Sequence, residues 1–182
     1  MIKDGRISRD ILNRAGQVKV ILMDVDGVLT SGMIVYDSNG VEIKHFNAHD
    51  GLAFKLARAA GLRTGFISAR ESGTIHRRAK ELGVDFLHLG SYKKFDAYQR
   101  LKESLKLQDE HFCFIGDDLP DIPVLRRVGF AVAVRNATDL VKEKVHYITQ
   151  REGGNGAVRE VVELILDAQG LLEKAVEKIL NE

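Results

Sequence analysis

Short apolar runs alternate with amphipathic stretches along most of the chain. The run at 18–23 is nearly continuous and rich in β-branched residues, which is typical of a strand buried on both faces of a parallel sheet. Similar runs predict strands at 62–68, 86–89, 111–116, 130–134 and 147–149. Helical spacing of apolar residues predicts helices at 50–60, 74–82, 94–105, 120–128, 138–144, 157–168 and 171–180. This alternation predicts an α/β fold, a parallel sheet with helices on both faces.

A β-hairpin interrupts the alternation after the first strand. Two β-type runs, at 33–36 and 41–46, flank the Asn39-Gly40 pair, which is a favoured hairpin turn. Residues 1–17 lack the apolar core of a signal peptide and are expected to form a loose lead-in that ends in a short amphipathic turn. We therefore expect one domain, 1–182, with a lead-in at 1–17, a hairpin flap at 33–46 and a C-terminal tail helix at 171–182.

Composition narrows the functional class. The chain has 182 residues, enough for one domain with a real core. Its net charge of +1 comes without a basic block, so we expect neither a nucleic-acid nor a membrane partner. No apolar run approaches the length of a membrane-spanning helix. The lone cysteine, Cys113, lies inside an apolar strand and is interpreted as a small buried hydrophobe, which fits a cytoplasmic location.

Carboxylates gather where two of the predicted strands end. Asp24 and Asp26 follow the first run, and because they are two residues apart they point to the same side of the chain. The strand at 111–116 is followed by Asp117, Asp118 and Asp121. Ligands of open α/β sheets bind at the carboxyl ends of the strands. Carboxylates held this close repel one another, so the arrangement favours a bound cation.

Two further polar residues stand at element boundaries between these acidic groups. Ser68 ends the strand at 62–68, and Lys94 opens the helix at 94–105. The order Asp/Asp, Ser, Lys, Asp/Asp resembles the four motifs of haloacid dehalogenase-like phosphohydrolases, and the resemblance spans about residues 18–170. It implies a Rossmann-like core. Larger members insert a cap domain after the first motif or between the second and third. Both gaps are short here, so a capless member with the hairpin as a small flap is expected.

The resemblance also implies site roles. Asp24 would be the nucleophile that forms an aspartyl-phosphate, and Asp26 the general acid and then the general base. Ser68 and Lys94 would bind phosphoryl oxygens, with Lys93 as an alternative lysine. The cofactor would be Mg²⁺, which prefers oxygen ligands. Its implied ligands are the Asp24 carboxylate, the Asp26 backbone carbonyl and the Asp117 carboxylate, with Asp118 and Asp121 as auxiliary or outer ligands.

The segments at 24–30, 46–51, 116–121, 153–160 and 168–170 resemble a capless branch of the family. This likeness implies an Mg²⁺-dependent phosphomonoesterase that hydrolyses 3-deoxy-D-manno-octulosonate 8-phosphate in lipopolysaccharide precursor biosynthesis. It also implies a homotetramer. Arg70 and Arg159 are candidates to bind the substrate carboxylate. His49, and Ala69 in Ser68-Ala69-Arg70, depart from the commoner residues of the family, and both positions bear on substrate selectivity.

Several alternatives stay open. One is a phosphatase for a sialic-acid-like 9-phosphate, and another is a broad sugar phosphatase. A more remote one is a phospho-acceptor switch domain, although such domains place the acidic pair and the phospho-acceptor on different strands. The glycine-rich loop at 153–156 is either a flexible lead into a helix capped by Asn155 or part of the rim of a substrate site, in its own or a neighbouring subunit.

Overall fold

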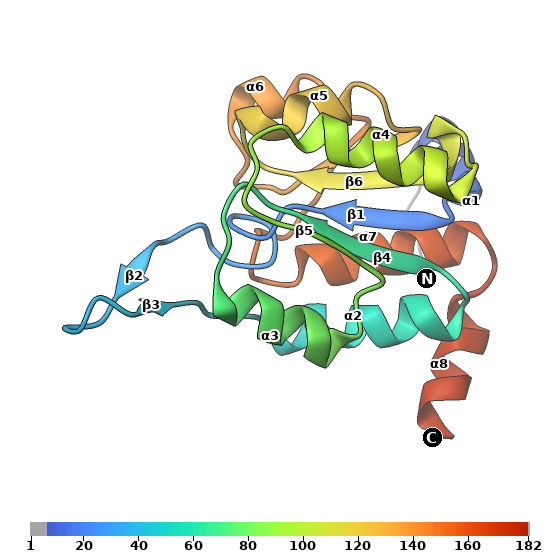
Figure 1. The fold of residues 1–182 in the computed structure, drawn as a ribbon. Helices are drawn as coiled ribbons and strands as arrows, with labels where there is room; N and C mark the ends of the chain where they lie inside the picture. Colours follow the sequence, from blue (N-terminus) through green and yellow to red (C-terminus); the bar gives the residue numbers. More distant parts are fainter. Residues whose placement is uncertain (1–6, 182) are drawn as a thin grey trace.

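A six-stranded parallel sheet forms the centre of the protein (Figure 1). The computed structural model describes residues 7–181; the start of the expected lead-in and the last residue of the tail, 1–6 and 182, lie outside the described residues. The strand order is β5-β4-β1-β6-β7-β8. The strands are β1 (Val20–Met23), β4 (Arg63–Ile67), β5 (Phe86–His88), β6 (Phe112–Gly116), β7 (Phe130–Ala133) and β8 (Tyr147–Ile148). The predicted fold class is therefore confirmed.

Strand β1 occupies the middle of the sheet. All four of its residues are fully buried, which explains the continuous apolar run. It pairs in parallel with β4 and β6, with Met23 opposite Phe66 on one side and Ile115 on the other. The carboxyl ends of these three strands therefore meet at one edge of the sheet, where Asp24, Ser68 and Asp117 follow them.

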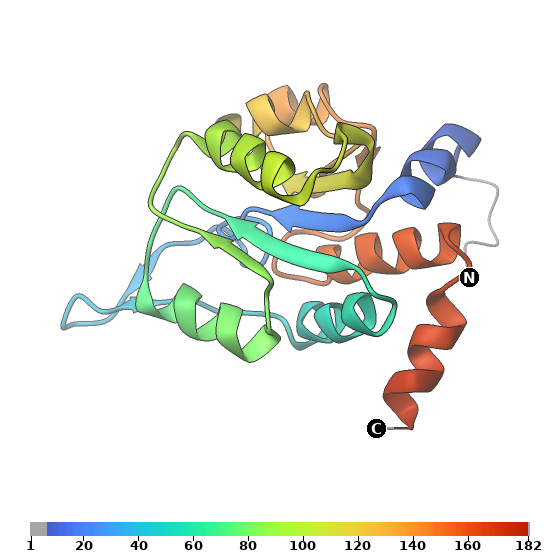
Figure 2. The ribbon, with the colours of Figure 1, turned by 45° about the vertical axis from the view of Figure 1, so that its right-hand side comes forward.

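Helices cover both faces of the sheet. One layer contains α2 (Ala48–Ala59), α3 (Gly73–Leu82) and α7 (Ala157–Ala168), and the other contains α4 (Lys94–Leu105), α5 (Ile122–Leu125) and α6 (Asp139–Lys142). Figures 1 and 2 place α1 (Arg9–Gln17) and α8 (Leu172–Leu180) at the end of the molecule away from the hairpin. No helix among residues 7–181 is long and apolar enough to cross a membrane.

Three elements differ from the expectations. The short turn expected near the N-terminus is the nine-residue helix α1, capped by Ser8, whose Oγ accepts from the Ile11 N–H at 3.3 Å. The helix expected at 120–128 is a 3₁₀ turn, η2 (Leu119–Asp121), followed by the short α5. Pro123 has no N–H to donate to the Leu119 carbonyl, so the 3₁₀ turn does not continue into α5 as one helix. A second 3₁₀ turn, η1 (Asp109–His111), was not expected.

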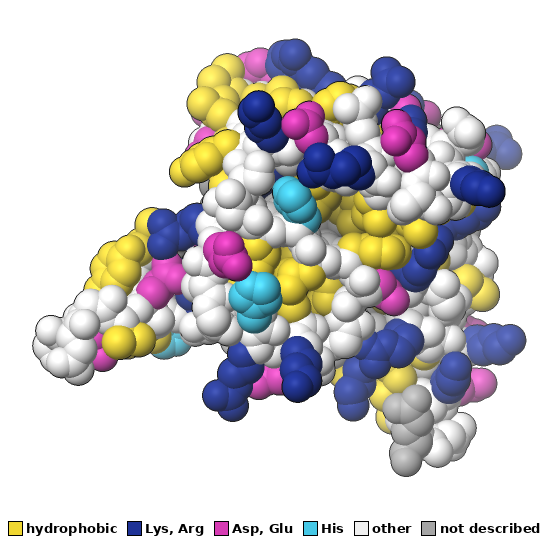
Figure 3. Space-filling model, viewed as in Figure 1, with side chains coloured by type: hydrophobic (Ala, Val, Ile, Leu, Met, Phe, Trp, Pro, Cys, Tyr) yellow, Lys and Arg dark blue, Asp and Glu magenta, His cyan; other side chains and the backbone are white. Residues whose placement is uncertain are grey.

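The predicted hairpin is present but its strands are short. β2 (Val35–Tyr36) and β3 (Glu42–Ile43) pair in antiparallel fashion. Figures 1 and 2 show the hairpin projecting from the carboxyl edge of the sheet. Figure 3 shows hydrophobic side chains along it. Its large exposed apolar residues are Met33, Ile34, Tyr36, Val41 and Ile43.

Candidate active site

Three carboxylates converge at the carboxyl edge of the sheet. Asp24 follows β1, Asp117 follows β6, and Asp121 lies in η2. Each offers an oxygen atom, and these oxygens all lie within 4.8 Å of one another. Asp121 is completely buried and Asp24 is 9% exposed. The structure therefore brings together carboxylates from the first and last acidic motifs.

Lys94 supplies the positive charge of this cluster. Its Nζ lies 2.8 Å from Asp24 Oδ2 and 2.7 Å from Asp121 Oδ1, and the side chain is 1% exposed. The preceding Lys93 is exposed at the N-terminus of α4. Of the two lysines considered from the sequence, the structure places Lys94 in the cluster.

Two local features hold the acidic groups together. Asp121 Oδ2 accepts the backbone N–H groups of Asp117 at 2.9 Å and Asp118 at 3.3 Å, so one carboxylate organises the whole turn. Gly27 has a φ of +92°, and a Cβ there would lie 2.0 Å from Asp117 Oδ2. A glycine at this position therefore lets the last acidic motif approach the turn that carries the first.

The electrostatics of the cluster favour an added cation. Burial, followed by the charge of Asp121, raises the pKa of Asp24 to about 6. Burial and the charges of Asp121 and Asp24 raise the pKa of Asp117 to about 8. Burial alone would lower the pKa of Lys94, but the two carboxylates beside it outweigh burial and raise that pKa. One ammonium therefore faces three carboxylates.

An unpartnered oxygen marks where that cation fits. Asp117 Oδ1 is buried and has no hydrogen-bond partner among the described residues. The ligand atoms that Asp24, Asp117 and Asp121 offer are carboxylate oxygens, the ligand type that Mg²⁺ prefers. The residues present therefore fit a divalent cation such as Mg²⁺.

Asp26 lies in a second group of charges, beside the flap. Its Oδ1 accepts from Lys44 Nζ at 2.5 Å, and its Oδ2 lies 3.6 Å from Arg70 Nε. Glu42 contacts both cations, Lys44 at 3.3 Å and Arg70 in a closer ion pair. Sequence reasoning selected Asp26 and Arg70 but missed Glu42 and Lys44. Their spacing of two along a β-type run, which puts both on one face of the hairpin, was the available signal.

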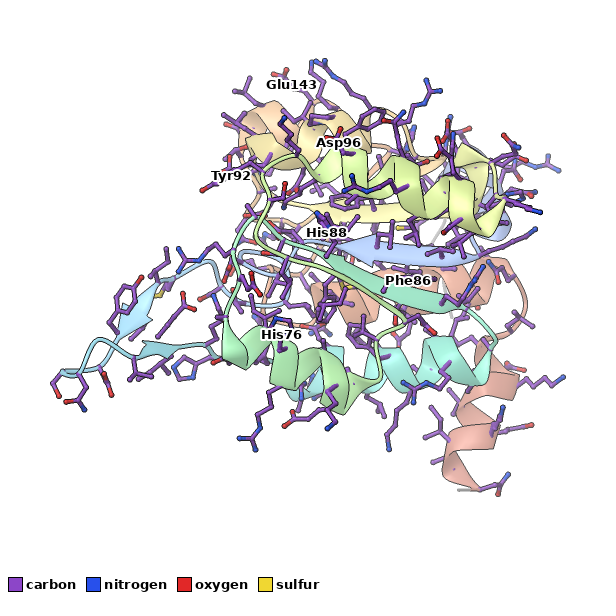
Figure 4. The ribbon with its side chains drawn as sticks, in the orientation of Figure 1. His76, Phe86, His88, Tyr92, Asp96 and Glu143 are labelled. Atoms are coloured by element: carbon purple, nitrogen blue, oxygen red, sulfur yellow. The ribbon has the colours of Figure 1, made fainter. Side chains whose placement is uncertain are left out.

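Ser68 is buried next to the end of β1. Its Oγ accepts from the Arg70 N–H at 3.2 Å, and its own N–H donates to the His88 carbonyl at 2.9 Å. Figure 4 labels His88 on β5 and Tyr92 on the loop that leads to α4. Asp118 is exposed, and its Oδ1 accepts from the Leu119 N–H at 2.8 Å. Asp118 thus caps η2 and lies outside the three-carboxylate cluster.

The glycine-rich loop packs against the turn that carries the first motif. The Gly154 N–H donates to the Val28 carbonyl at 2.8 Å. A Cβ at Gly153 would lie 1.7 Å from the Gly27 carbonyl oxygen. The loop is therefore packed closely against this turn, and its place at the rim of a substrate site stays a prediction.

Asp50, which sequence reasoning also missed, holds the start of α7. Its two oxygens accept the backbone N–H groups of Gly156 at 3.0 Å and Arg159 at 2.9 Å. The cap that Asn155 was considered for is therefore supplied by α2, and the residue at the N-cap is Gly156. The side chain of Arg159 pairs with Glu163 at 2.6 Å, one helical turn further along α7.

Comparisons with known proteins agree with this geometry. A model of the haloacid dehalogenase-like hydrolase family matches residues 84–161. The chain is 40% identical to the 3-deoxy-D-manno-octulosonate 8-phosphate phosphatase of Yersinia pestis over 171 residues, which cover 94% of this chain and 91% of that protein.

Solved structures give the same result. A probable YrbI family phosphatase from Pseudomonas syringae pv. phaseolica is 45% identical with a TM-score of 0.92, and the match covers 95% of this chain and 98% of that one. The 3-deoxy-D-manno-octulosonate 8-phosphate phosphatase of Moraxella catarrhalis, in complex with magnesium, phosphate and KDO, is 39% identical with a TM-score of 0.92, covering 95% and 99%. The chain therefore belongs to the haloacid dehalogenase-like hydrolase family, as the order of its four motifs predicts.

Proposed function

We propose that this protein is an Mg²⁺-dependent phosphomonoesterase that hydrolyses 3-deoxy-D-manno-octulosonate 8-phosphate to the free sugar acid and phosphate. The observation that carries the proposal is the buried cluster in which Lys94 bridges Asp24 and Asp121. Identity of 40% to the Yersinia pestis phosphatase, over nearly the whole of both chains, supports the substrate. This reaction would contribute to lipopolysaccharide precursor biosynthesis.

In the first step, an oxygen of Asp24 attacks the phosphorus atom and the bond to the sugar oxygen breaks. Asp26 donates a proton to that leaving oxygen, so the product departs as an alcohol. In the second step, Asp26 takes a proton from a water molecule as the water oxygen attacks the aspartyl-phosphate. Phosphate leaves and the Asp24 carboxylate is restored.

Lys94 and Ser68 are proposed to bind the phosphoryl oxygens. Lys94 Nζ already lies within 2.8 Å of Asp24, so its charge lies next to the group that attacks phosphorus. Its burial keeps water away and strengthens its interaction with developing negative charge. Ser68 is also buried, and it follows the strand that pairs with β1.

The proposed Mg²⁺ ligands are the carboxylates of Asp24 and Asp117 and the backbone carbonyl of Asp26. Both oxygens of Asp121 already accept hydrogen bonds, which favours an outer, orienting position for this residue. Asp118 is proposed as a further outer ligand. When bound, the ion neutralises charge on the phosphate and on the nucleophile.

Arg70 and Arg159 are the proposed contacts for the substrate carboxylate. Arg70 lies beside Asp26 at the base of the flap, which favours a place along the sugar. Arg159 lies at the start of α7 and pairs with Glu163 in this chain. A role for Arg159 therefore requires that pair to open, or a site shared with a neighbouring subunit.

We further propose a cytoplasmic homotetramer. The hairpin exposes five large apolar side chains, and a capless site needs a cover that excludes water. Contacts between hairpins of neighbouring copies would bury these side chains and supply that cover.

A phosphate-release assay over a panel of sugar phosphates, with and without Mg²⁺, tests the function. We expect repeated turnover, dependence on Mg²⁺, and the highest kcat/KM on 3-deoxy-D-manno-octulosonate 8-phosphate. A preference for a sialic-acid-like 9-phosphate, or similar rates on many sugar phosphates, would overturn the substrate but keep the reaction class. One stable phosphoryl group per chain without turnover would instead identify a phospho-acceptor switch.

A further inference from the structure

One lysine of the flap reaches into the candidate active site. Lys44 directly follows β3, yet its side chain is only 3% exposed although much of the hairpin is exposed. Its Nζ lies 2.5 Å from Asp26 Oδ1 and 3.3 Å from Glu42 Oε1. Lysine is rarely buried this completely unless it is paired. Its position is therefore fixed by these two carboxylates.

This contact divides the two oxygens of Asp26 into different environments. Oδ1 accepts from Lys44, whereas Oδ2 is buried and has no hydrogen-bond partner among the described residues. Arg70 Nε lies 3.6 Å from Oδ2, and it too is buried without a hydrogen-bond partner in the described part of the chain. The two groups therefore form an ion pair with each other, at a distance too long for a hydrogen bond.

Asp26 Oδ2 is therefore the oxygen of this carboxylate that Lys44 does not occupy. In the proposed reaction the sugar oxygen of the phosphate ester would accept from a protonated Oδ2, and a water molecule would donate to an ionised Oδ2. These are the two oxygens that exchange a proton with Asp26 in the proposed reaction.

We propose that Lys44 is a positioning residue for Asp26. Its ammonium holds Oδ1 toward the flap and so keeps Oδ2 facing the oxygen that gains or loses the proton. The inference rests on the proposed function, in which Asp26 is the general acid and base. It makes the flap part of the proton-transfer machinery as well as a cover.

Leaving-group dependence tests the proposal. The first step on p-nitrophenyl phosphate needs no proton from Asp26, because nitrophenolate is a stable anion. The first step on 3-deoxy-D-manno-octulosonate 8-phosphate needs one, because its leaving group is an alkoxide. Rapid mixing measures both first steps, as the burst of nitrophenolate and of free sugar acid. Burst amplitude counts the folded sites, so poor folding lowers the amplitude and leaves the rate readable.

The variants are Lys44→Met, Lys44→Arg, Asp26→Asn and, as a matched control, Lys102→Met. Lys102 pairs with Asp109 at 2.7 Å at the far end of α4 and takes no part in the site. We expect Lys44→Met to slow the first step on the sugar acid phosphate by about 10- to 100-fold, a large part of a general-acid contribution, and the nitrophenolate burst by less than about 3-fold. Lys44→Arg should restore most of the loss, and Lys102→Met should match wild type.

Each contrary result has a distinct meaning. Equal losses on both esters in Lys44→Met would overturn the proposal, since a distorted site slows both. Near wild-type rates in Lys44→Met, alongside a selective loss in Asp26→Asn, would overturn the proposed role of Lys44 and leave that of Asp26 standing. If Asp26→Asn shows no selectivity between the esters, then the proposed role of Asp26 fails, and the role of Lys44 fails with it.

Discussion

At the scale of single residues, replacing Asp24 by Asn is expected to abolish turnover. An amide is a poor nucleophile, and it also removes one of the three clustered carboxylates. We expect kcat/KM to fall by more than about four orders of magnitude, measured as phosphate release. A thermal unfolding curve like that of wild type would show that the fold is kept. Activity within about tenfold of wild type would reject Asp24 as the nucleophile.

Asp117→Asn is expected to separate stability from metal binding. Asp117 is pressed against two other carboxylates, and its pKa is raised to about 8 by burial and by them. A folded-state pKa above the unfolded value means that this carboxylate costs stability as pH rises toward 8. Without metal, the Tm of the variant should therefore exceed that of wild type. A gain of about 1 kcal/mol in the free energy of unfolding corresponds to about 2–4 °C in a chain of this size.

Differential scanning calorimetry in EDTA and in Mg²⁺ measures both effects. Wild type should gain Tm on adding Mg²⁺, because a ligand that binds only the folded state stabilises it. Asp117→Asn should lose most of that gain. A variant that melts lower in EDTA would contradict the interpretation that like charges repel in this cluster.

The clustered site residues that were predicted from the sequence share one property. Asp24, Lys94 and Asp117 each stand where a strand or helix begins or ends, and such boundaries can be read locally. Lys44 and Asp50 also lie near the ends of elements, but their roles could not be inferred from the sequence, because their partners are Asp26 and the backbone of α7. Those contacts depend on how the hairpin and α2 pack back onto the sheet, which a linear pattern does not contain.

At the scale of elements, Asp50→Asn should weaken the contact between α2 and α7. The carboxylate accepts two backbone N–H groups at the start of α7, whereas an amide offers one oxygen and turns its NH₂ toward the second donor. Loss of a charged, buried cap is expected to cost about 1–3 kcal/mol in the free energy of unfolding. Urea denaturation measures it.

Asp10→Asn is the matched control for Asp50→Asn. Asp10 forms an exposed i,i+4 pair with Arg14 on α1, so this substitution should cost less than about 0.5 kcal/mol. Equal costs for the two substitutions would contradict the assignment of Asp50 as the cap of α7.

His146 should make the edge of the sheet sensitive to acid. Its Nδ1 accepts from the Ala131 N–H at 2.9 Å, which requires a neutral ring. Burial, with a smaller contribution from the charge of Arg14, lowers the pKa of His146 below its ordinary 6.5. The stability it contributes is therefore present above pH 6.5 and lost as pH falls below that value.

Asn at position 146 keeps an acceptor in place of Nδ1 but does not titrate. We expect His146→Asn to lose less stability than wild type between about pH 8 and about pH 5, the range in which histidine titrates. Urea unfolding at both pH values measures the difference. Parallel losses in the two proteins would show that His146 is not the titrating group.

The predicted elements agree with the structure where one chemical pattern spans the whole element. The helix at 94–105 has the predicted bounds because apolar spacing and end residues coincide. The prediction of one helix at 120–128 was wrong. The apolar spacing there is helical, but Pro123 and the hydrogen bonds of the Asp121 side chain favour a 3₁₀ turn before the short helix α5.

At the scale of the whole molecule, the hairpin should control assembly. Replacing the exposed Ile34 and Val41 by Ser removes apolar surface without touching the charged group around Asp26. We expect light scattering to show a tetramer for wild type and a smaller species for the variant, with lower kcat/KM. A wild-type protein that is monomeric and fully active at micromolar concentration would refute the proposed assembly.

The overall architecture followed from alternation, but strand order did not. Alternating strands and helices predict a parallel sheet with two helical layers, since parallel strands need crossover connections. The placement of β1 between β4 and β6 arises from packing between segments that are distant in sequence. This order is what brings the first and last acidic motifs to neighbouring strands.

The contact between the glycine-rich loop and the turn after β1 has a consequence for synthesis. The Val28 carbonyl receives its partner from Gly154, and Asp50 receives its partners from the start of α7. A nascent chain on the ribosome thus exposes an acidic turn long before the segment that completes its packing has been made. The active site should become complete only when α7 has left the ribosome. Stalled or truncated chains that stop before α7 would therefore be inactive and exposed to proteases.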